Sequence, residues 1–486
     1  MPEQILLQGK ILGIEEFLLS RPGRSSGEEL LTTRSQWITL ITEVLPRALL
    51  AELGLSRMLL GSSGGGQFLL VLPGEARTSA EEHLSAAARH IGELSQGVLR
   101  LLWGVTENLG DWSVVRKRLM EGIQRGRGTP LAQTPDHALQ AVFQPYEPAA
   151  SPQPTYFLGE SGVKLREASS VGWSPESPGA VWLNGGKHRW NLTPNLSAEG
   201  ITVARHAAPA DDGKLSATVQ MLARRSYGRP IWGVLRGDAD NFGVRLRRLQ
   251  TIEEHVQLSV LYKQFFAGEL EVVCSMPEFW RKVTILYSGG DDFAVYGSWD
   301  ALILLAREMQ RLFHRFTEEN LKEFPGPEGK TITMALALAP EMHSPMAAVY
   351  DDAGRNLEFA KASDKDCIHL LGRILEWKQL SDAAEMKDTV TRLLSDSRAS
   401  RQFLGDLRRF YQRESYSAGP RGAESTVQSA WRFQRRFNRI LSGTKDREFQ
   451  KLRSHLIYEM MGRKSPEVKL RPAGLVALEW ARLASD

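Results

Sequence analysis

The fold of this chain is decided by residues 287–296, which read Tyr287-Ser288-Gly289-Gly290-Asp291-Asp292-Phe293-Ala294-Val295-Tyr296. Two adjacent carboxylates stand on a glycine turn between two apolar segments of the kind that form β-strands. Glycine permits a tight turn and lets the backbone approach a phosphate closely. The pattern indicates a phosphate and metal site at the tip of a hairpin. The alternative is a surface hairpin in which Gly and Asp serve only as turn residues.

A second acidic segment lies upstream, Gly233-Val234-Leu235-Arg236-Gly237-Asp238-Ala239-Asp240-Asn241-Phe242-Gly243. It is an apolar strand pattern ending in acidic residues at alternate positions, and we expect it to neighbour the hairpin in one sheet. Mg²⁺ prefers hard oxygen ligands and usually keeps water and substrate phosphate in its shell, so two or three carboxylates are enough. Two such ions roughly 3.5–4 Å apart support in-line displacement on a triphosphate. The predicted ligands of Mg²⁺ or Mn²⁺ are Asp238, Asp240, Asp291 and Asp292.

The hairpin pattern occurs a second time near the N-terminus, without its carboxylates. Ser63-Gly64-Gly65-Gly66-Gln67-Phe68-Leu69-Leu70-Val71 aligns with residues 288–296, so that Gly66 and Gln67 stand in place of the two aspartates. Gly9-Lys10-Ile11-Leu12 aligns with residues 237–240 in the same way, and residues 99–104 take the place of the strand near Thr331. The repeat predicts two copies of one domain, the first unable to hold a metal pair. The alternative is chance recurrence of glycine-rich turns.

Four regions are predicted along the chain. Residues 1–135 form the degenerate copy, with helices over 36–52 and 79–94, and residues 136–213 form a proline-rich linker and a small insert with strand-like pieces at 180–183 and 200–205. Residues 214–372 form the intact copy, in which apolar residues at helical spacing predict a core-facing helix over 301–316. Residues 373–486 form a helical region, with helices predicted over 375–395, 399–415, 424–442 and 446–462.

Composition narrows the class of protein. A chain of 486 residues is long enough for about three or four domains. Its two cysteines, Cys274 and Cys367, exclude a cysteine zinc ribbon and indicate a reducing compartment. No apolar run reaches the length of a membrane span and the N-terminus lacks a secretory pattern, so we expect a cytoplasmic location without membrane contact. The net charge is only +4, but the C-terminal region mixes arginines with aromatic residues, which suits either RNA contact or helix packing.

Several segments together resemble a known family: residues 237–243 and 288–292, then Trp299-Asp300, residues 331–337, and Leu357-Glu358-Phe359-Ala360-Lys361. In order and spacing they resemble the palm domain of polymerases and cyclases, and more closely the large subunit of type III CRISPR effector complexes, CRISPR-associated protein ten. The resemblance implies an α+β fold with two ferredoxin-like palm domains, the first degenerate, and a C-terminal helical bundle. Many members carry Cys-x-x-Cys elements between the palms, and this chain does not.

The resemblance also implies an activity and a site. The activity is synthesis of cyclic oligoadenylates from ATP, switched on when complementary target RNA is captured. The implied partners are the backbone and small subunits of the complex, CRISPR RNA and target RNA. Asp238, Asp291 and Asp292 would be catalytic, and the nucleotide would contact Ser288, Gly289, Gly290, Asn241, Phe242 and Lys361.

Other functions remain open from the residues alone. A diguanylate cyclase shares the palm but uses one palm per chain and dimerises. A related enzyme could join ATP to another acceptor such as S-adenosylmethionine, and a non-catalytic scaffold would keep the palm as architecture only. The chain contains no His-Asp dipeptide, on which the nuclease domain of many relatives is built. We therefore expect no intrinsic DNase activity and no such nuclease domain.

Overall fold

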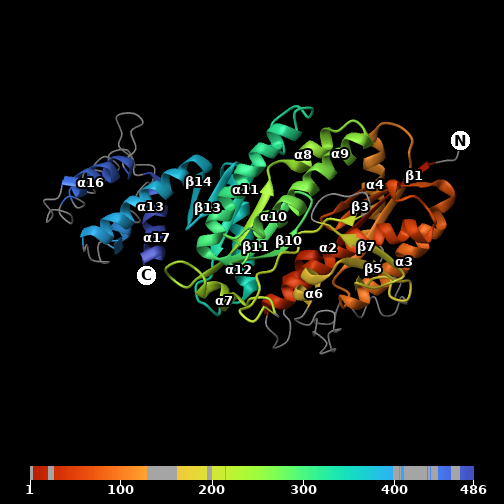
Figure 1. The fold of residues 1–486 in the computed structure, drawn as a ribbon. Coiled ribbons are helices and arrows are strands. Elements are labelled where there is room, and N and C mark those ends of the chain that lie inside the picture. The colour runs from red at the N-terminus through yellow and green to blue at the C-terminus, as the bar shows by residue number, and fades with distance from the viewer. Residues whose placement is uncertain are drawn as a thin grey trace.

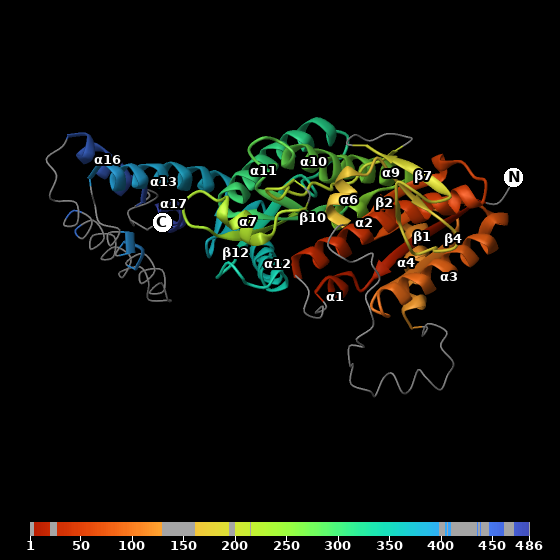
Figure 2. The same ribbon diagram turned by 60° about the horizontal axis from the view of Figure 1, so that its bottom comes forward.

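The computed structural model describes residues 4–19, 27–128, 161–193, 200–213, 215–397, 404–405, 407–409, 435, 438, 447–460 and 471–485. The described residues form an elongated arrangement in which the first sheet and the C-terminal helices lie at opposite ends (Figure 1). A second view shows the same order, with the second sheet and its helices in the middle (Figure 2). The expected mixed α and β architecture is confirmed.

The first sheet has the strand order β2-β3-β1-β4, and neighbouring strands are antiparallel. Alternate residues of β1 point into different cores, since Leu7 packs with residues of α2 and α3 whereas Leu6 packs with residues of α4. The elements of this domain are β1 (Gln4–Leu12), α1 (Ile14–Leu19), α2 (Gly27–Glu52), η1 (Arg57–Leu59), β2 (Leu60–Gly64), β3 (Gln67–Pro73), η2 (Gly74–Ala76), α3 (Arg77–Leu94), β4 (Arg100–Glu107) and α4 (Trp112–Gly128).

The second sheet has the order β10-β11-β9-β12-β13-β14, and only β12 and β13 run parallel. The inner strand β9 is buried on both faces, because its Val234 packs with residues of α12 and its Leu235 packs with residues of α11. Burial on both faces explains the continuous apolar runs in the strands of this sheet. The elements are α7 (Val219–Arg224), β9 (Trp232–Ala239), α8 (Phe242–Arg248), α9 (Ile252–Lys263), the π-helical turn η4 (Gln264–Glu269), α10 (Leu270–Cys274), β10 (Val283–Ser288), β11 (Asp292–Ser298), α11 (Trp299–Asn320), β12 (Ile332–Leu338), α12 (Met346–Ser363), β13 (Cys367–Leu370) and β14 (Arg373–Glu376).

The predicted internal repeat is confirmed by strand order and register. The order β2-β3-β1-β4 matches β10-β11-β9-β12, strand for strand. Gly9 faces Phe68 across the first sheet as Gly237 faces Phe293 across the second, and a Cβ on either glycine would lie 2.2 or 2.4 Å from that phenylalanine ring. The next pair is Lys10 with Gln67 in the first sheet and Asp238 with Asp292 in the second. The first copy therefore keeps the backbone of the site and lacks its carboxylates.

The insert between the two palms forms a small sheet of order β6-β5-β7-β8 that packs on the first palm. Trp173 stacks on His83 of α3 at 5.0 Å between ring centroids, and His188 contacts Glu52 of α2 at 2.5 Å. Strands β6 and β8 lie within the predicted strand-like pieces, whereas β5 and β7 were not predicted. The insert comprises α6 (Ser161–Glu167), β5 (Ser170–Trp173), β6 (Trp182–Leu183), β7 (His188–Leu192) and β8 (Gly200–Ile201).

The C-terminal helices α13 (Trp377–Ser397), α16 (Arg447–Met460) and α17 (Pro472–Ser485) pack together at the far end of the second palm. Helices α13 and α16 were predicted and α17 was not. The helices predicted over 399–415 and 424–442 lie largely outside the described residues. Strand β14 continues the second sheet past the expected boundary after residue 372. None of the helices that the structure describes is long and apolar enough to cross a bilayer.

Candidate active site

The two acidic segments meet at one edge of the second sheet, as the sequence predicts. Asp238 near the end of β9 lies directly across from Asp292 at the start of β11, and Thr333 of β12 faces Asp238 from the other side. Asp291 occupies the turn, where its carbonyl accepts a hydrogen bond from the N–H of Ala239 at 2.9 Å. Antiparallel pairing of β9 and β11 thus brings three carboxylates from separate segments together.

The three carboxylates repel one another in a half-buried setting. Burial raises the pKa of Asp291, and the negative charges of Asp292 and Asp238 raise it further. Burial and Asp238 likewise raise the pKa of Asp292 to about 6, although Tyr287, Arg236 and Lys361 oppose the shift. The pKa of Asp238 is also raised by burial, against the effect of Lys361, whose Nζ lies 2.7 Å from its carboxylate. The site therefore carries more negative charge than its own cations compensate.

This charge imbalance fits a divalent metal ion. Carboxylate oxygens are the ligands that Mg²⁺ prefers, and a bound cation relieves repulsion between neighbouring carboxylates. Within the described residues, no group of three or more His, Cys, Asp or Glu side chains is already gathered around one metal position. Asp238, Asp291 and Asp292 are the residues that could hold the metal, and their ligation stays a prediction.

Asp240 is placed differently from the other three aspartates. Its side chain is buried, and it accepts hydrogen bonds from Thr331 Oγ1 at 2.8 Å, Thr333 Oγ1 at 2.7 Å and the N–H of Asp366 at 3.0 Å. These bonds join the end of β9 to β12 and to the turn before β13. The structure thus puts Asp240 in a hydrogen-bond network that holds the strand ends, and its role as a metal ligand stays a prediction.

The glycine turn is shaped by its neighbours. A Cβ on Gly289 would lie 1.9 Å from Asp292 Oδ1, so only glycine fits beneath that carboxylate. A Cβ on Gly290 would meet nothing within 4 Å, which leaves the backbone there open to a ligand. Ser288 does not point freely into the site, because its hydroxyl donates to the carbonyl of Phe266 in η4 at 2.6 Å.

The other predicted nucleotide contacts are more dispersed. Asn241 adopts a left-handed conformation with φ 58°, and its Oδ1 accepts a hydrogen bond from Lys365 Nζ. Phe242 is 8% exposed, and its ring centroid lies 4.3 Å from that of Tyr262, so its side chain packs in the core. Lys361 of α12 is paired with Asp238, with Nζ 2.7 Å from Oδ2.

A cavity of ≈ 240 Å³ lies where the two palms meet. It is lined by Gly65 and Gly66 of the first palm and by Ser288, Gly289 and Asp292 of the second. A Cβ on Gly65, which has φ +57°, would lie 3.2 Å from the nitrogen of Gly290, so the two glycine turns are in contact. Sites that enclose a small ligand usually measure about 300–1,000 Å³. The cavity is therefore large enough for part of a nucleotide.

Sequence reasoning missed the aromatic wall of this cavity. Arg236 lies with its guanidinium 4.5 Å from the ring centroid of Tyr350 and donates to the hydroxyl of Tyr287 at 3.3 Å. The hydroxyl of Tyr287 donates in turn to Asp292 Oδ2 at 3.1 Å. Because side chains alternate along a strand, Arg236 shares the face of Asp238 two residues later. That arginine in an apolar strand was a usable signal, whereas Tyr350 comes from α12 and only the fold brings it here.

Residues 231–369 match the family model described as Cas10/Cmr2, second palm domain. This part of the chain is therefore similar to the second palm domain of the large subunits of type III CRISPR systems. The chain is similar to the Cas10/Csm1 single-strand-specific deoxyribonuclease of Thermococcus onnurineus, with 22% identity over 441 residues, 76% of this chain and 55% of that protein. The protein of the same description from Mycobacterium tuberculosis is 23% identical over 437 residues, 72% of this chain and 52% of that protein. The chain thus spans about half the length of these curated relatives.

Solved structures show the same fold. The apo Csm1–Csm4 cassette superposes with a TM-score of 0.74 at 18% identity, and the match covers 100% of this chain and 70% of the other. A Csm1–Csm4 cassette in complex with cA4 superposes with a TM-score of 0.72 at 16% identity and the same coverage. The fold class, with its palm domains, is shown by these similarities.

Proposed function

We propose that this type III CRISPR large subunit synthesises cyclic oligoadenylates from ATP by metal-dependent nucleotidyl transfer when its complex captures complementary target RNA. The observation that carries the proposal is the group of Asp238, Asp291 and Asp292 beside a cavity shared by two palms. Solved Csm1–Csm4 cassettes of similar fold are described in complex with cA4 and with AMPPNP, which supports ATP as substrate and an oligoadenylate product.

The roles of the residues follow from their positions. Asp238, Asp291 and Asp292 would hold the metal ions, which would supply positive charge to activate a ribose hydroxyl and to stabilise the triphosphate. The open backbone at Gly290 admits the phosphates. Lys361 would exchange its contact with Asp238 for the triphosphate, since an ammonium group suits phosphate as a point charge.

The first palm supplies the other side of the site. Gly65 and Gly66 line the cavity opposite Asp292, with no carboxylate at the positions equivalent to Asp291 and Asp292. An acceptor nucleotide on this side would face the triphosphate held by the second palm. In-line attack needs the two reacting groups about 3–3.5 Å apart, so a rigid boundary between the palms favours the reaction.

The partners we propose are the other subunits of the effector complex, CRISPR RNA and target RNA, and the proposed location is the cytoplasm. Support for a subunit partner comes from solved Csm1–Csm4 complexes of the same fold. The curated relatives are named deoxyribonucleases, and lack of DNase activity in this chain stays a prediction. The test is an assay of the purified chain for nicking of single-stranded DNA. Nicking that persists after substitution of Asp291 and Asp292 would contradict the prediction.

The experiment is to assemble the chain with guide RNA and partner subunits, add ATP with Mg²⁺ or Mn²⁺, and identify products by mass spectrometry with and without target RNA. We expect cyclic oligoadenylates that require target RNA and disappear in Asp291→Asn/Asp292→Asn. Asp352→Asn on the exposed face of α12 is the control for loss of a carboxylate elsewhere. Intact ATP in every condition, with target RNA still bound, would favour a scaffold, and an adduct with S-adenosylmethionine would change the product.

A further inference from the structure

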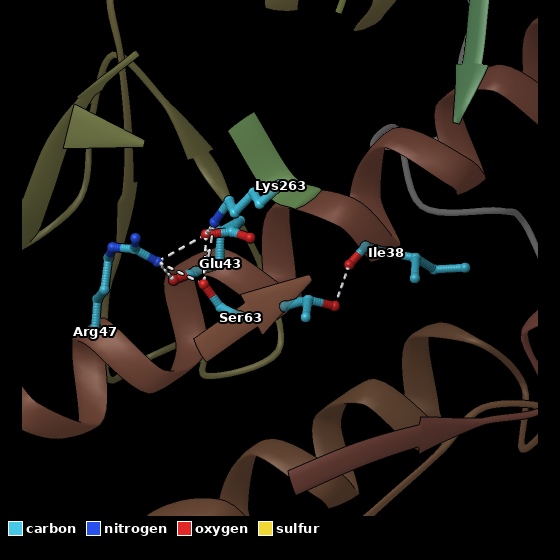
Figure 3. Close-up of polar contacts among 6 residues, drawn as sticks. Ile38, Glu43, Arg47, Ser63 and Lys263 are labelled. Carbon is cyan, nitrogen blue, oxygen red and sulfur yellow. Dashed lines mark hydrogen bonds and ion pairs between the residues drawn. The ribbon is translucent and has the colours of Figure 1, made fainter. Parts of the chain in front are cut away.

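A buried cluster of charged side chains joins the two palms. Glu43 and Arg47 come from α2 and Ser63 from β2, all in the first palm, whereas Lys263 ends α9 in the second palm (Figure 3). The carboxylate of Glu43 accepts from Lys263 Nζ at 2.6 Å, from Arg47 at 2.8 Å and from Ser63 Oγ at 2.9 Å. Lys263 Nζ also donates to Ser63 Oγ at 3.2 Å. Lys263 is the member of this cluster that crosses the palm boundary.

The cluster is withdrawn from water. The side chain of Glu43 is 2% exposed, and those of Lys263 and Arg47 are 13% and 15% exposed. Burial alone would raise the pKa of Glu43, but Lys263 and Arg47 outweigh it and the net shift is downward. A buried ion pair adds little stability relative to apolar residues, yet losing one partner is costly because a buried charge is left behind. Such a pair fixes the relative position of two elements more than it stabilises the fold.

The cluster adjoins the first glycine turn and is linked to the second through α9 and η4. Ser63 immediately precedes Gly64-Gly65-Gly66, and Ser288 occupies the equivalent place before Gly289-Gly290. Both serine hydroxyls are held by one continuous helical segment, α9 followed by η4: Ser63 contacts Lys263, and Ser288 donates to the carbonyl of Phe266. Positions 263 and 266 are three residues apart, so they lie close together on a helical segment.

The π-helical turn gives this segment its special character. Turns of this type are rare and frequently occur at functional sites, because the wider ladder alters the hydrogen bonding of its carbonyls. Here η4 follows Lys263 directly and presents the Phe266 carbonyl to Ser288 at 2.6 Å. One helical segment therefore contacts both glycine turns. It contacts the turn of the second palm through Phe266 and the matching turn of the first palm through Lys263.

We propose that Lys263 and Glu43 are positioning residues that set the spacing between the two glycine turns and so align the two nucleotides for attack. The proposal rests on the proposed function, since two nucleotides must meet between the palms. A Cβ added at Gly65 would lie 3.2 Å from the nitrogen of Gly290, so the two turns are next to each other and a change in their spacing alters the site directly. Loosening Lys263 leaves the carboxylates and Lys361 in place, so binding of a single nucleotide to the second palm is retained while the reaction slows.

The test compares two matched substitutions in the assembled complex. Lys263→Met and Arg47→Met each remove one buried cation from Glu43 and leave the other, but only Lys263 belongs to the second palm. A displacement of about 1 Å can lower a rate by about 100-fold. We expect Lys263→Met to lower kcat by about 10–100-fold with KM for ATP within about twofold, and Arg47→Met to keep kcat within about threefold. Equal losses of kcat in the two variants, or a loss that follows Tm, would overturn the proposal.

A second measurement does not depend on activity. Hydrogen exchange of the full chain is followed in peptides that cover residues 60–68 and 284–294. Lys263→Met should speed exchange at both turns. Arg47→Met should affect at most the first turn, because Arg47 Nη1 lies 3.5 Å from Ser63 Oγ and the hydrogen bonds of Arg47 to described residues stay within the first palm. Unchanged exchange at residues 284–294 in Lys263→Met would count against the proposal. If Lys263→Met does not fold, the neutral pair Glu43→Gln/Lys263→Met replaces it. A wild-type complex that makes no product refutes the proposed function, whereas the exchange result still decides whether Lys263 holds the turns.

Discussion

Replacement of Asp240 by asparagine separates a structural carboxylate from a metal ligand. Asp240 Oδ2 accepts from Thr331 Oγ1 and the Asp366 N–H, and Oδ1 accepts from Thr333 Oγ1. In Asp240→Asn one oxygen becomes an NH₂ donor. At the Oδ2 position that donor would face the N–H of Asp366. At the Oδ1 position the hydroxyl of Thr333, which already accepts from the Asp366 N–H at 3.1 Å, would have to accept from the new NH₂ group instead of donating. The bonds that remain lose their assistance from a full charge.

Hydrogen bonds to charged groups contribute about 1.5–3 kcal/mol and neutral ones about 1 kcal/mol, so the loss is about 2–4 kcal/mol. For a domain of about 150–250 residues, 1 kcal/mol shifts Tm by about 2–4 °C, so we expect a fall of about 4–16 °C. The assay is thermal unfolding followed by tryptophan fluorescence, because Trp232 and Trp299 are buried in the second palm. The comparison variant Asp238→Asn removes a carboxylate whose pKa burial raises, so it should leave Tm unchanged or higher.

Two results would refute this reasoning. One is a Tm for Asp240→Asn within about 2 °C of wild type, because the hydrogen bonds to Asp240 would then not contribute measurably to stability. The other is a need for metal that rises as much in Asp240→Asn as in Asp238→Asn, measured by titrating Mn²⁺ at a temperature where both variants are folded. That result would make Asp240 a metal ligand after all.

Three further predictions concern other parts of the two palms. Gly65→Ala should reduce oligoadenylate synthesis far more than the control Gly97→Ala. Both glycines have positive φ, but only a Cβ at Gly65 would crowd Gly290. Equal effects of the two substitutions in a product assay would contradict the contact between the turns. His255 is half-buried beside Trp112, and its partial burial lowers its pKa to about 4. As the pH falls, the unfolded chain therefore binds this proton first, and stability drops between about pH 6.5 and pH 4 by about 3 kcal/mol in total. His255→Phe should remove that share of the pH dependence in a urea unfolding series, and an unchanged slope would show that His255 does not titrate as inferred. Lys361→Met should raise KM for ATP. It should also tighten Mn²⁺ binding in the absence of nucleotide, since Asp238 loses its competing cation. Weaker Mn²⁺ binding of the variant in calorimetry would argue against the proposal that Lys361 moves from Asp238 to the triphosphate.

Local sequence patterns predicted most of the secondary structure of the second palm. The glycine turn between two apolar runs predicted the β10–β11 hairpin, and apolar residues at helical spacing predicted α11, because both patterns depend on neighbours a few residues away. The first palm was predicted by comparison with the second, since the glycine and phenylalanine of each copy must pair across a sheet in the same register. Strands β5 and β7 are only four and five residues long, so the alternation of Val171 with Trp173 and of Trp190 with Leu192 was too short to predict a strand.

The sequence by itself placed the candidate carboxylates: Asp238 and Asp292 at the ends of two strands, Asp291 in the turn between β10 and β11, and none at the equivalent positions of the first palm. Strand alternation and turn chemistry are short-range properties, so they can be read along the chain. Only the tertiary structure decided that Asp240 is held by Thr331, Thr333 and Asp366, and that Phe242 packs against Tyr262 in the core. It alone also brought Lys263 to Glu43 across the palm boundary. Those contacts join residues far apart in sequence, and their partners are set by how the two palms pack.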